Sequence, residues 1–195
     1  MEDVLINKNR EYPGVELLED HEIMVSVKDG DVHKLGLLFD RHAQGLFNYF
    51  QLQVRDRFRS EDLVQNVFYK ILKYRHTFKE GADFRVWMYA IARNEKVNFF
   101  KHNRSSDEEV NPEQPDENSN NPENDLASKT DKKHLGRALE RISPDSRELL
   151  ILSKYTGLPY NRIAEIYDCT VGAIKVRIFR AMQELKAQFV NIAEE

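Results

Sequence analysis

The chain contains a single cysteine, Cys169, among its 195 residues. This excludes an intramolecular disulfide and a cysteine-rich metal site, and it fits a protein of the reducing cytoplasm. Runs of about 18 consecutive apolar residues, which a membrane-spanning helix needs, are also missing, so the sequence predicts no span. The first twenty residues are acidic and have no apolar stretch, and we therefore expect no secretory signal.

The usual signatures of catalytic sites are absent as well. The six histidines have no metal-ligand spacing, no glycine-rich phosphate loop occurs, and no base is evident beside Cys169. We therefore expect a protein that is not an enzyme and that uses no cofactor or metal ion.

The net charge of −4 argues at first against a nucleic-acid partner. The acidic residues, however, are concentrated in two segments. Residues 105–128 hold eight acidic residues and no Lys or Arg, and residues 1–24 hold seven acidic and two basic residues. The remaining chain has 27 basic and 18 acidic residues. That basic remainder is what nucleic-acid binding requires, although two ordinary domains with solvated surfaces are also compatible with it.

A linker is predicted at residues 105–130, because this segment is rich in Asn, Pro, Glu, Asp and Ser and poor in large apolar residues. Such a composition cannot bury enough surface to offset the entropy of ordering. Its first 24 residues would span at most ~80 Å when extended and ~27 Å as a coil. We expect tails outside the two domains at 1–19 and 191–195.

Apolar residues at helical spacing on both sides of the linker predict an all-α protein of two small domains, 20–104 and 131–190. In the first domain we expect helices over residues 20–28, 31–53 and 83–102. A further helix is expected to begin near Ser60, with this residue as its N-cap. In the second we expect a helix around Leu135 to Ile142, one opened by Ser143-Pro144, and two more over 160–167 and 171–190.

The most informative stretch is residues 160–185, which predicts a helix-turn-helix. A short helix carries Ile163 and Ala164, a tight turn follows, and Thr170 can cap the next helix. That helix has an apolar side for packing and a basic, polar side that suits the major groove. The simpler alternative is a pair of amphipathic helices in a bundle, in which Arg177 would be a surface or core-edge residue.

Residues 84–104 combine five basic residues with five aromatic ones, a mixture that suits single-stranded nucleic acid. Asn94 and Asn98 lie four residues apart and can present amides to a base. The alternatives are that Phe84 and Trp87 belong to the core and that the two asparagines are solvated. The helix around EDLVQNVF, residues 61–68, is by itself an ordinary amphipathic helix.

Three blocks together resemble the extracytoplasmic-function (ECF) sigma factors of bacterial RNA polymerase. They are EDLVQNVF at 61–68, FRVWMYAIARNEKVNFF at 84–100 and RIAEIYDCTVGAIKVRIFRAMQEL at 162–185. Their order and separation also resemble the family, and the likeness covers most of residues 20–190. It implies a region 2 module that recognises and melts the promoter at its minus-ten element, and a region 4 module that reads the minus-thirty-five element.

The resemblance also implies roles for individual residues. Polymerase docking is expected from Asp62, Gln65 and Asn66. Minus-ten recognition and melting are expected from Phe78, Lys79, Phe84, Trp87, Asn94 and Asn98, and upstream-element recognition from Lys175, Val176, Arg177, Phe179 and Arg180. The implied partners are core RNA polymerase, promoter DNA in duplex and single-stranded form, and an anti-sigma factor.

The sequence differs from the usual family pattern at two positions of the predicted recognition helix. Ala173 and Val176 stand where family members often have hydroxyl residues, so no promoter preference follows from the resemblance. The alternative function is a two-domain helix-turn-helix regulator that acts without polymerase.

Overall fold

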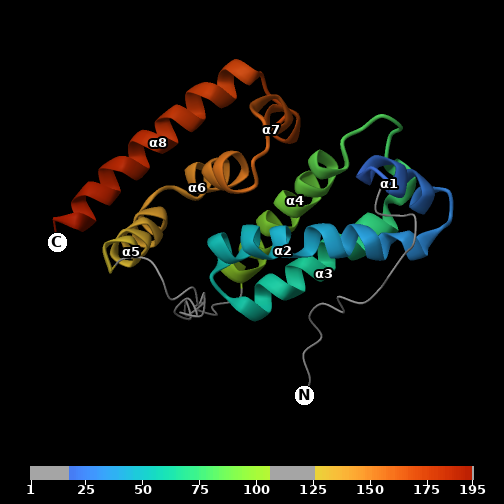
Figure 1. The fold of residues 1–195 in the computed structure, drawn as a ribbon, viewed down its shortest axis with the longest axis horizontal. Coiled ribbons are helices and arrows are strands. Elements are labelled where there is room, and N and C mark those ends of the chain that lie inside the picture. Colours follow the sequence, from blue (N-terminus) through green and yellow to red (C-terminus); the bar gives the residue numbers. More distant parts are fainter. Residues whose placement is uncertain (1–17, 106–125, 195) are drawn as a thin grey trace. The chain divides into compact units, whose positions relative to one another are not determined.

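The computed structural model describes residues 18–105 and 126–194, and within these ranges it contains helices and no strand, which confirms the all-α prediction (Figure 1). The first range holds α1 (Asp20–Lys28), the 3-10 turn η1 (Val32–Lys34), α2 (Leu35–Val54), α3 (Arg57–Lys73), η2 (Arg75–Thr77) and α4 (Phe84–Ser105). The second range holds α5 (Leu126–Arg141), α6 (Pro144–Leu150), the π-helical turn η3 (Ile151–Tyr155), α7 (Tyr160–Ile166) and α8 (Val171–Ala193).

Most of the predicted linker lies outside the described residues. Its last five positions are helical, because α5 begins at Leu126. None of the helices in the described ranges is both long and apolar enough to cross a membrane.

By their contacts, residues 18–48 and 61–105 form one compact unit, and residues 49–60 form a second with residues 126–194. In the first unit, α1 has the predicted bounds and is tied to α2 through Asp20. Its carboxylate accepts a hydrogen bond of 2.9 Å from Arg41 and lies 2.6 Å from Nε2 of His42. The hydrogen bond with His42, together with Arg41 and against the effect of burial, lowers the pKa of Asp20 below its usual 3.8.

One predicted cap is wrong. Ser60 does not begin α3 but lies inside it, fully buried, and its hydroxyl donates to the Asp56 carbonyl. The cap is Asp56, whose Oδ1 accepts from the Arg59 amide at 2.9 Å. The apolar periodicity starts after Ser60, so it gave no signal for the polar first turn. Asp83 plays the corresponding role for α4 by accepting from the Arg85 amide at 2.9 Å.

In the second unit, α8 packs against α5, α6 and α7 and buries Ile174, Ile178 and Ala181. The caps predicted at Ser143 and Thr170 are confirmed, since each hydroxyl accepts from the amide three residues later. Glu184 of α8 holds the start of α6, because its two carboxylate oxygens accept from the Ser143 amide and the Ser146 hydroxyl.

A buried carboxylate organises the centre of the second unit. Glu148 is 2% exposed and accepts a hydrogen bond from the Tyr49 hydroxyl at 2.5 Å and from the Tyr167 hydroxyl at 2.8 Å. Burial, followed by the neighbouring Glu148 charge, raises the pKa of Tyr49 well above its usual 10. Two hydroxyl donors to one carboxylate provide the partners that a buried charge needs.

Candidate nucleic-acid interface

The predicted helix-turn-helix is present as α7, a turn over residues 167–170, and α8. The amides of Tyr167 and Cys169 donate to the carbonyls of Ile163 and Ala164, at 3.0 and 3.1 Å. Asp168 has φ 49°, a left-handed conformation that Asp tolerates better than most residues. Ala164 of α7 is buried, and α7 packs against α8.

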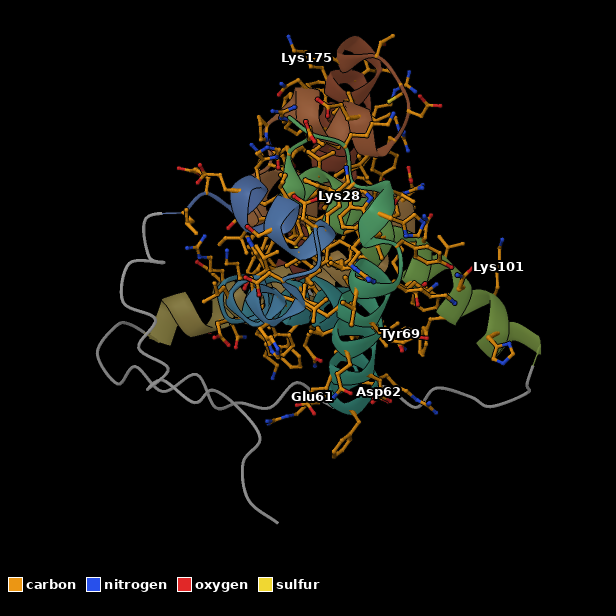
Figure 2. All side chains as sticks on the ribbon, turned by 90° about the vertical axis from the view of Figure 1, so that its right-hand side faces the viewer. Lys28, Glu61, Asp62, Tyr69, Lys101 and Lys175 are labelled. Carbon is orange, nitrogen blue, oxygen red and sulfur yellow. The ribbon has the colours of Figure 1, made fainter. Side chains whose placement is uncertain are left out.

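Four predicted upstream-element residues share the side of α8 that faces away from its core residues. At about 100° per residue, Lys175, Val176, Phe179 and Arg180 fall within one arc roughly opposite Ile174, Ile178 and Ala181. All four are exposed. We call these four residues the reading face of α8. Figure 2 shows Lys175 near the start of this helix.

Arg177, the fifth residue predicted for this role, is engaged elsewhere. Its Nη2 lies 2.6 Å from Oδ2 of Asp145 on α6, and its guanidinium carbon lies 4.7 Å from the centre of the Tyr167 ring. The hydrogen bond to Asp145 raises the pKa of Arg177 above its usual value. On the helix, Arg177 lies about 160° around from Phe179. The structure therefore does not place Arg177 with the other four residues.

The α4 helix presents a second polar face. Trp87, Asn94, Asn98 and Lys101 lie within about 60° of one another on the helix, and we call them the α4 face. Trp87 is half-buried and the other three are exposed. The amides, the indole and the ammonium group can serve base edges, base stacking and the DNA backbone.

The two phenylalanines predicted to line the minus-ten site lie beneath this face. Phe78 and Phe84 are each 1% exposed, and their ring centres lie 5.2 and 6.5 Å from that of Trp87. Lys28 donates to the Phe78 carbonyl at 2.9 Å and fixes the loop. Neither ring is open to a DNA base in this arrangement, and the two support Trp87 instead. Lys79, next to Phe78, is exposed.

The three predicted docking residues, Asp62, Gln65 and Asn66, are all exposed on α3. Phe58 and Tyr69 extend the same surface and are 70% and 62% exposed. Phe58, Asp62, Gln65 and Tyr69 follow the spacing i, i+4, i+7, i+11, which draws one straight line along a helix. We call them the α3 stripe; Figure 2 labels Asp62 and Tyr69 on this helix.

The sequence prediction missed Phe58 and Tyr69. The signal was available, because both fall opposite the apolar positions of α3, where a large aromatic residue has no role in the core. An ion pair between Lys70 and the buried Glu95 connects α3 to α4. Within the described residues, no group of three or more His, Cys, Asp or Glu side chains could hold a metal ion.

Comparisons with known proteins identify two family models in the chain. The family model described as "Sigma-70 region 2" matches residues 38–106, and "Sigma-70, region 4" matches 133–185. The chain is 28% identical over 166 residues to the RNA polymerase sigma factor CarQ of Myxococcus xanthus, covering 84% of this chain and 93% of the relative. It is 29% identical over 180 residues to the ECF RNA polymerase sigma-E factor of Escherichia coli strain K12, covering 87% and 94%.

A solved structure has the same fold. It is the sigma factor RpoE in complex with the anti-sigma factor NepR from Bartonella quintana, with a TM-score of 0.65 and 25% identity over 78% of this chain and 94% of that one. The α4 face lies in the segment that matches region 2, and the reading face of α8 lies in the segment that matches region 4. This chain therefore belongs to the ECF sigma factors of RNA polymerase, which recognise promoters and initiate transcription.

Proposed function

We propose that this sigma factor docks on core RNA polymerase through the α3 stripe and Asn66, reads the minus-thirty-five element with α8, and captures melted minus-ten bases on the α4 face with Lys79. It acts in the cytoplasm, where polymerase and promoter DNA are found. It catalyses no reaction of its own and needs no cofactor, because binding free energy drives promoter opening.

The observation that supports this proposal is that one chain carries two exposed faces of different composition, the reading face of α8 and the α4 face. The reading face of α8 belongs to a helix-turn-helix, which suits duplex DNA. The α4 face combines an aromatic ring with amides and a cation, which suits unpaired bases. A regulator that only binds duplex DNA has no use for the second surface, and that alternative is not favoured.

Promoter opening has a definite energetic requirement. Extruding a base costs a few kcal/mol, and stacking returns ~1–3 kcal/mol for each base. Trp87 is suited to this task because Phe78 and Phe84 hold its ring in place from below. A ring that is already positioned loses little entropy when a base stacks on it. Asn94 and Asn98 add hydrogen bonds to the edge of the captured base.

The α3 stripe has the heptad-like spacing with which helices pack against one another in coiled coils, so a helical surface on the polymerase would complement it. Its two aromatic residues would fill holes on the partner, and Asp62 and Gln65 between them would fix the register. Aromatic anchors surrounded by polar groups are typical of interfaces that form and dissociate.

An anti-sigma factor is the third partner that we propose. The Bartonella quintana sigma factor, whose fold this chain shares, was solved with one bound. A protein that covers the reading face of α8 or the α3 stripe would prevent promoter binding or polymerase docking.

The test is run-off transcription from a genomic library with purified core polymerase and the full chain. We expect specific transcripts and co-purification of the chain with the core enzyme, and the transcripts also supply the promoter motif. An Asp62→Ala, Gln65→Ala double variant should lose co-purification.

Tyr155→Ala provides the matched control, because Tyr155 is 53% exposed and lies outside the α3 stripe. This variant should bind the core enzyme like the wild type. A chain that binds duplex DNA but never associates with core polymerase would refute the proposal.

A further inference from the structure

The centre of the reading face is apolar. Val176 is 50% exposed and Phe179 is 64% exposed, although the helix already packs its core through Ile174, Ile178 and Ala181. The scaffold gains little from two large apolar side chains in water. A partner that covers them must therefore offer apolar groups at this position.

Cations flank the apolar pair. On the helix Val176 and Phe179 are about 60° apart, with Lys175 at one edge of the reading face and Arg180 at the other. The sole acidic residue between 171 and 186 is Glu184, and it is bound to Ser143 and Ser146. Arg177 is directed toward Asp145 and Tyr167. The reading face is thus an apolar centre between two positive charges.

This arrangement complements duplex DNA more closely than it complements a protein helix. Lys and Arg at the edges suit the phosphates on the two sides of a groove. Valine and phenylalanine have no hydrogen-bonding groups, so they cannot read the donors and acceptors of base edges. The apolar feature that the major groove offers them is the C5-methyl group of thymine.

Building on the proposed function, we propose that Val176 and Phe179 determine specificity by contacting thymine methyl groups in the upstream promoter element, while Lys175 and Arg180 hold the adjacent phosphates. This predicts that the element contains at least one thymine, on either strand, whose methyl group strengthens binding. The prediction rests on side chains of this chain, at a position where the family resemblance gave no promoter preference.

The test replaces single thymines by deoxyuridine, which removes only the methyl group. Promoter duplexes are taken from the run-off experiment, and the affinity of the complete holoenzyme is measured on each. We expect about a four-fold loss for each contacted methyl at one or two positions, from the free energy of burying one such group. Thymines outside the upstream element should be insensitive.

Two protein variants assign the effect to side chains. Phe179→Ala should bind the thymine duplex more weakly and should no longer distinguish thymine from deoxyuridine at one of these positions. Arg180→Ala is the control, because it should weaken binding to both duplexes while the ratio between them stays as in the wild type. Phe179 is exposed, so its truncation leaves the core intact.

Each outcome is decisive. Equal affinity for thymine and deoxyuridine at every position, in a holoenzyme that still binds the promoter, overturns the methyl contacts and leaves the sigma function standing. If Phe179→Ala binds the promoter normally but binds a protein partner more weakly, Val176 and Phe179 belong to the surface for that partner. This result also overturns the proposed methyl contacts. A chain that supports no promoter binding at all refutes the proposed function first.

Discussion

The guanidinium of Arg177 stacks over the ring of Tyr167 while it is paired with Asp145. This contact connects α6, α7 and α8, because Asp145 belongs to α6, Tyr167 follows α7, and Arg177 belongs to α8. A cation–π contact contributes ~0.5–1 kcal/mol at an exposed site, and an exposed ion pair contributes a similar amount. Together they help to fix the rotation of α8 about its axis, and hence the direction of its reading face.

Exchanging the two charges tests this role of Arg177. Asp145→Arg and Arg177→Asp alone should each lower the stability of the protein by about 1 kcal/mol and weaken promoter binding, because each leaves two like charges together. The double exchange should recover part of both losses, since the pair is rebuilt. Chemical unfolding and holoenzyme binding measure the two effects. If Arg177 instead contacts a phosphate, the double variant should still bind the promoter weakly. The dependence of promoter affinity on salt concentration should then fall by the equivalent of about one charge.

Glu148 should be among the most sensitive positions for stability. Replacing it by Leu leaves the hydroxyls of Tyr49 and Tyr167 without this acceptor, and we expect a loss of about 3 kcal/mol or more. Tyr167→Phe removes one hydrogen bond to the carboxylate and should cost about 2 kcal/mol. Urea unfolding of the full chain measures both. Glu165→Gln, on an exposed carboxylate of α7, is the control and should change stability little. A Glu148→Leu variant with the same free energy of unfolding as the wild type would contradict the role of this hydrogen-bond network in stability.

Substitutions in the α3 stripe should weaken binding to core polymerase without lowering the stability of the fold. Phe58→Ala and Tyr69→Ala should each weaken association with core polymerase by about ten-fold, as expected for an aromatic anchor. Both side chains are largely exposed, so the unfolding free energy should change by less than about 0.5 kcal/mol. Titration of labelled protein with core polymerase measures the association. Unchanged affinity in both variants would leave docking to other residues.

The sequence was sufficient for those parts of the fold in which helical periodicity and capping agree. Asp20–Lys28, Ser143-Pro144 and the Thr170 cap were predicted as the structure has them. Ser60 was misread because periodicity locates the buried stripe of a helix but not its polar first turn, which Asp56 caps.

The candidate sites were less predictable, since residue type does not specify a partner in space. Arg177 has the positive charge that a DNA-binding residue needs, yet it forms an ion pair with Asp145, which lies 32 residues earlier in the sequence. Phe78 and Phe84 have the residue type that stacks on bases, yet they pack beneath Trp87. Tertiary packing decides both cases, and a one-dimensional pattern does not contain it.

Asp20 predicts a pH dependence of stability in the first unit. Its pKa is lowered in the folded protein, so its contribution is present above pH 3.8 and is lost as the pH falls below that value. Asp20→Asn should be less stable than the wild type by about 1 kcal/mol at neutral pH, and the difference should narrow below pH 3.8. Thermal unfolding across this range measures it, with Asp40→Asn, on an exposed carboxylate of α2, as the control. A constant difference down to pH 3 would argue against the interaction.

Promoter binding and promoter opening should respond to different surfaces. Arg180→Ala should reduce formation of the closed complex, because it removes a cation from the face that reads duplex DNA. Asn94→Ala should leave that step nearly intact and slow opening, since its amide acts on a base only after melting. Gel-shift binding on duplex promoter measures the first step, and permanganate reactivity of unpaired thymines measures the second.

The two variants should differ also on a template that is already melted at the minus-ten element. There Asn94→Ala should still bind more weakly than the wild type, whereas Arg180→Ala should recover much of its activity, because single-strand contacts replace the lost upstream contact. Identical defects on both templates would mean that the two faces do not act at separate steps.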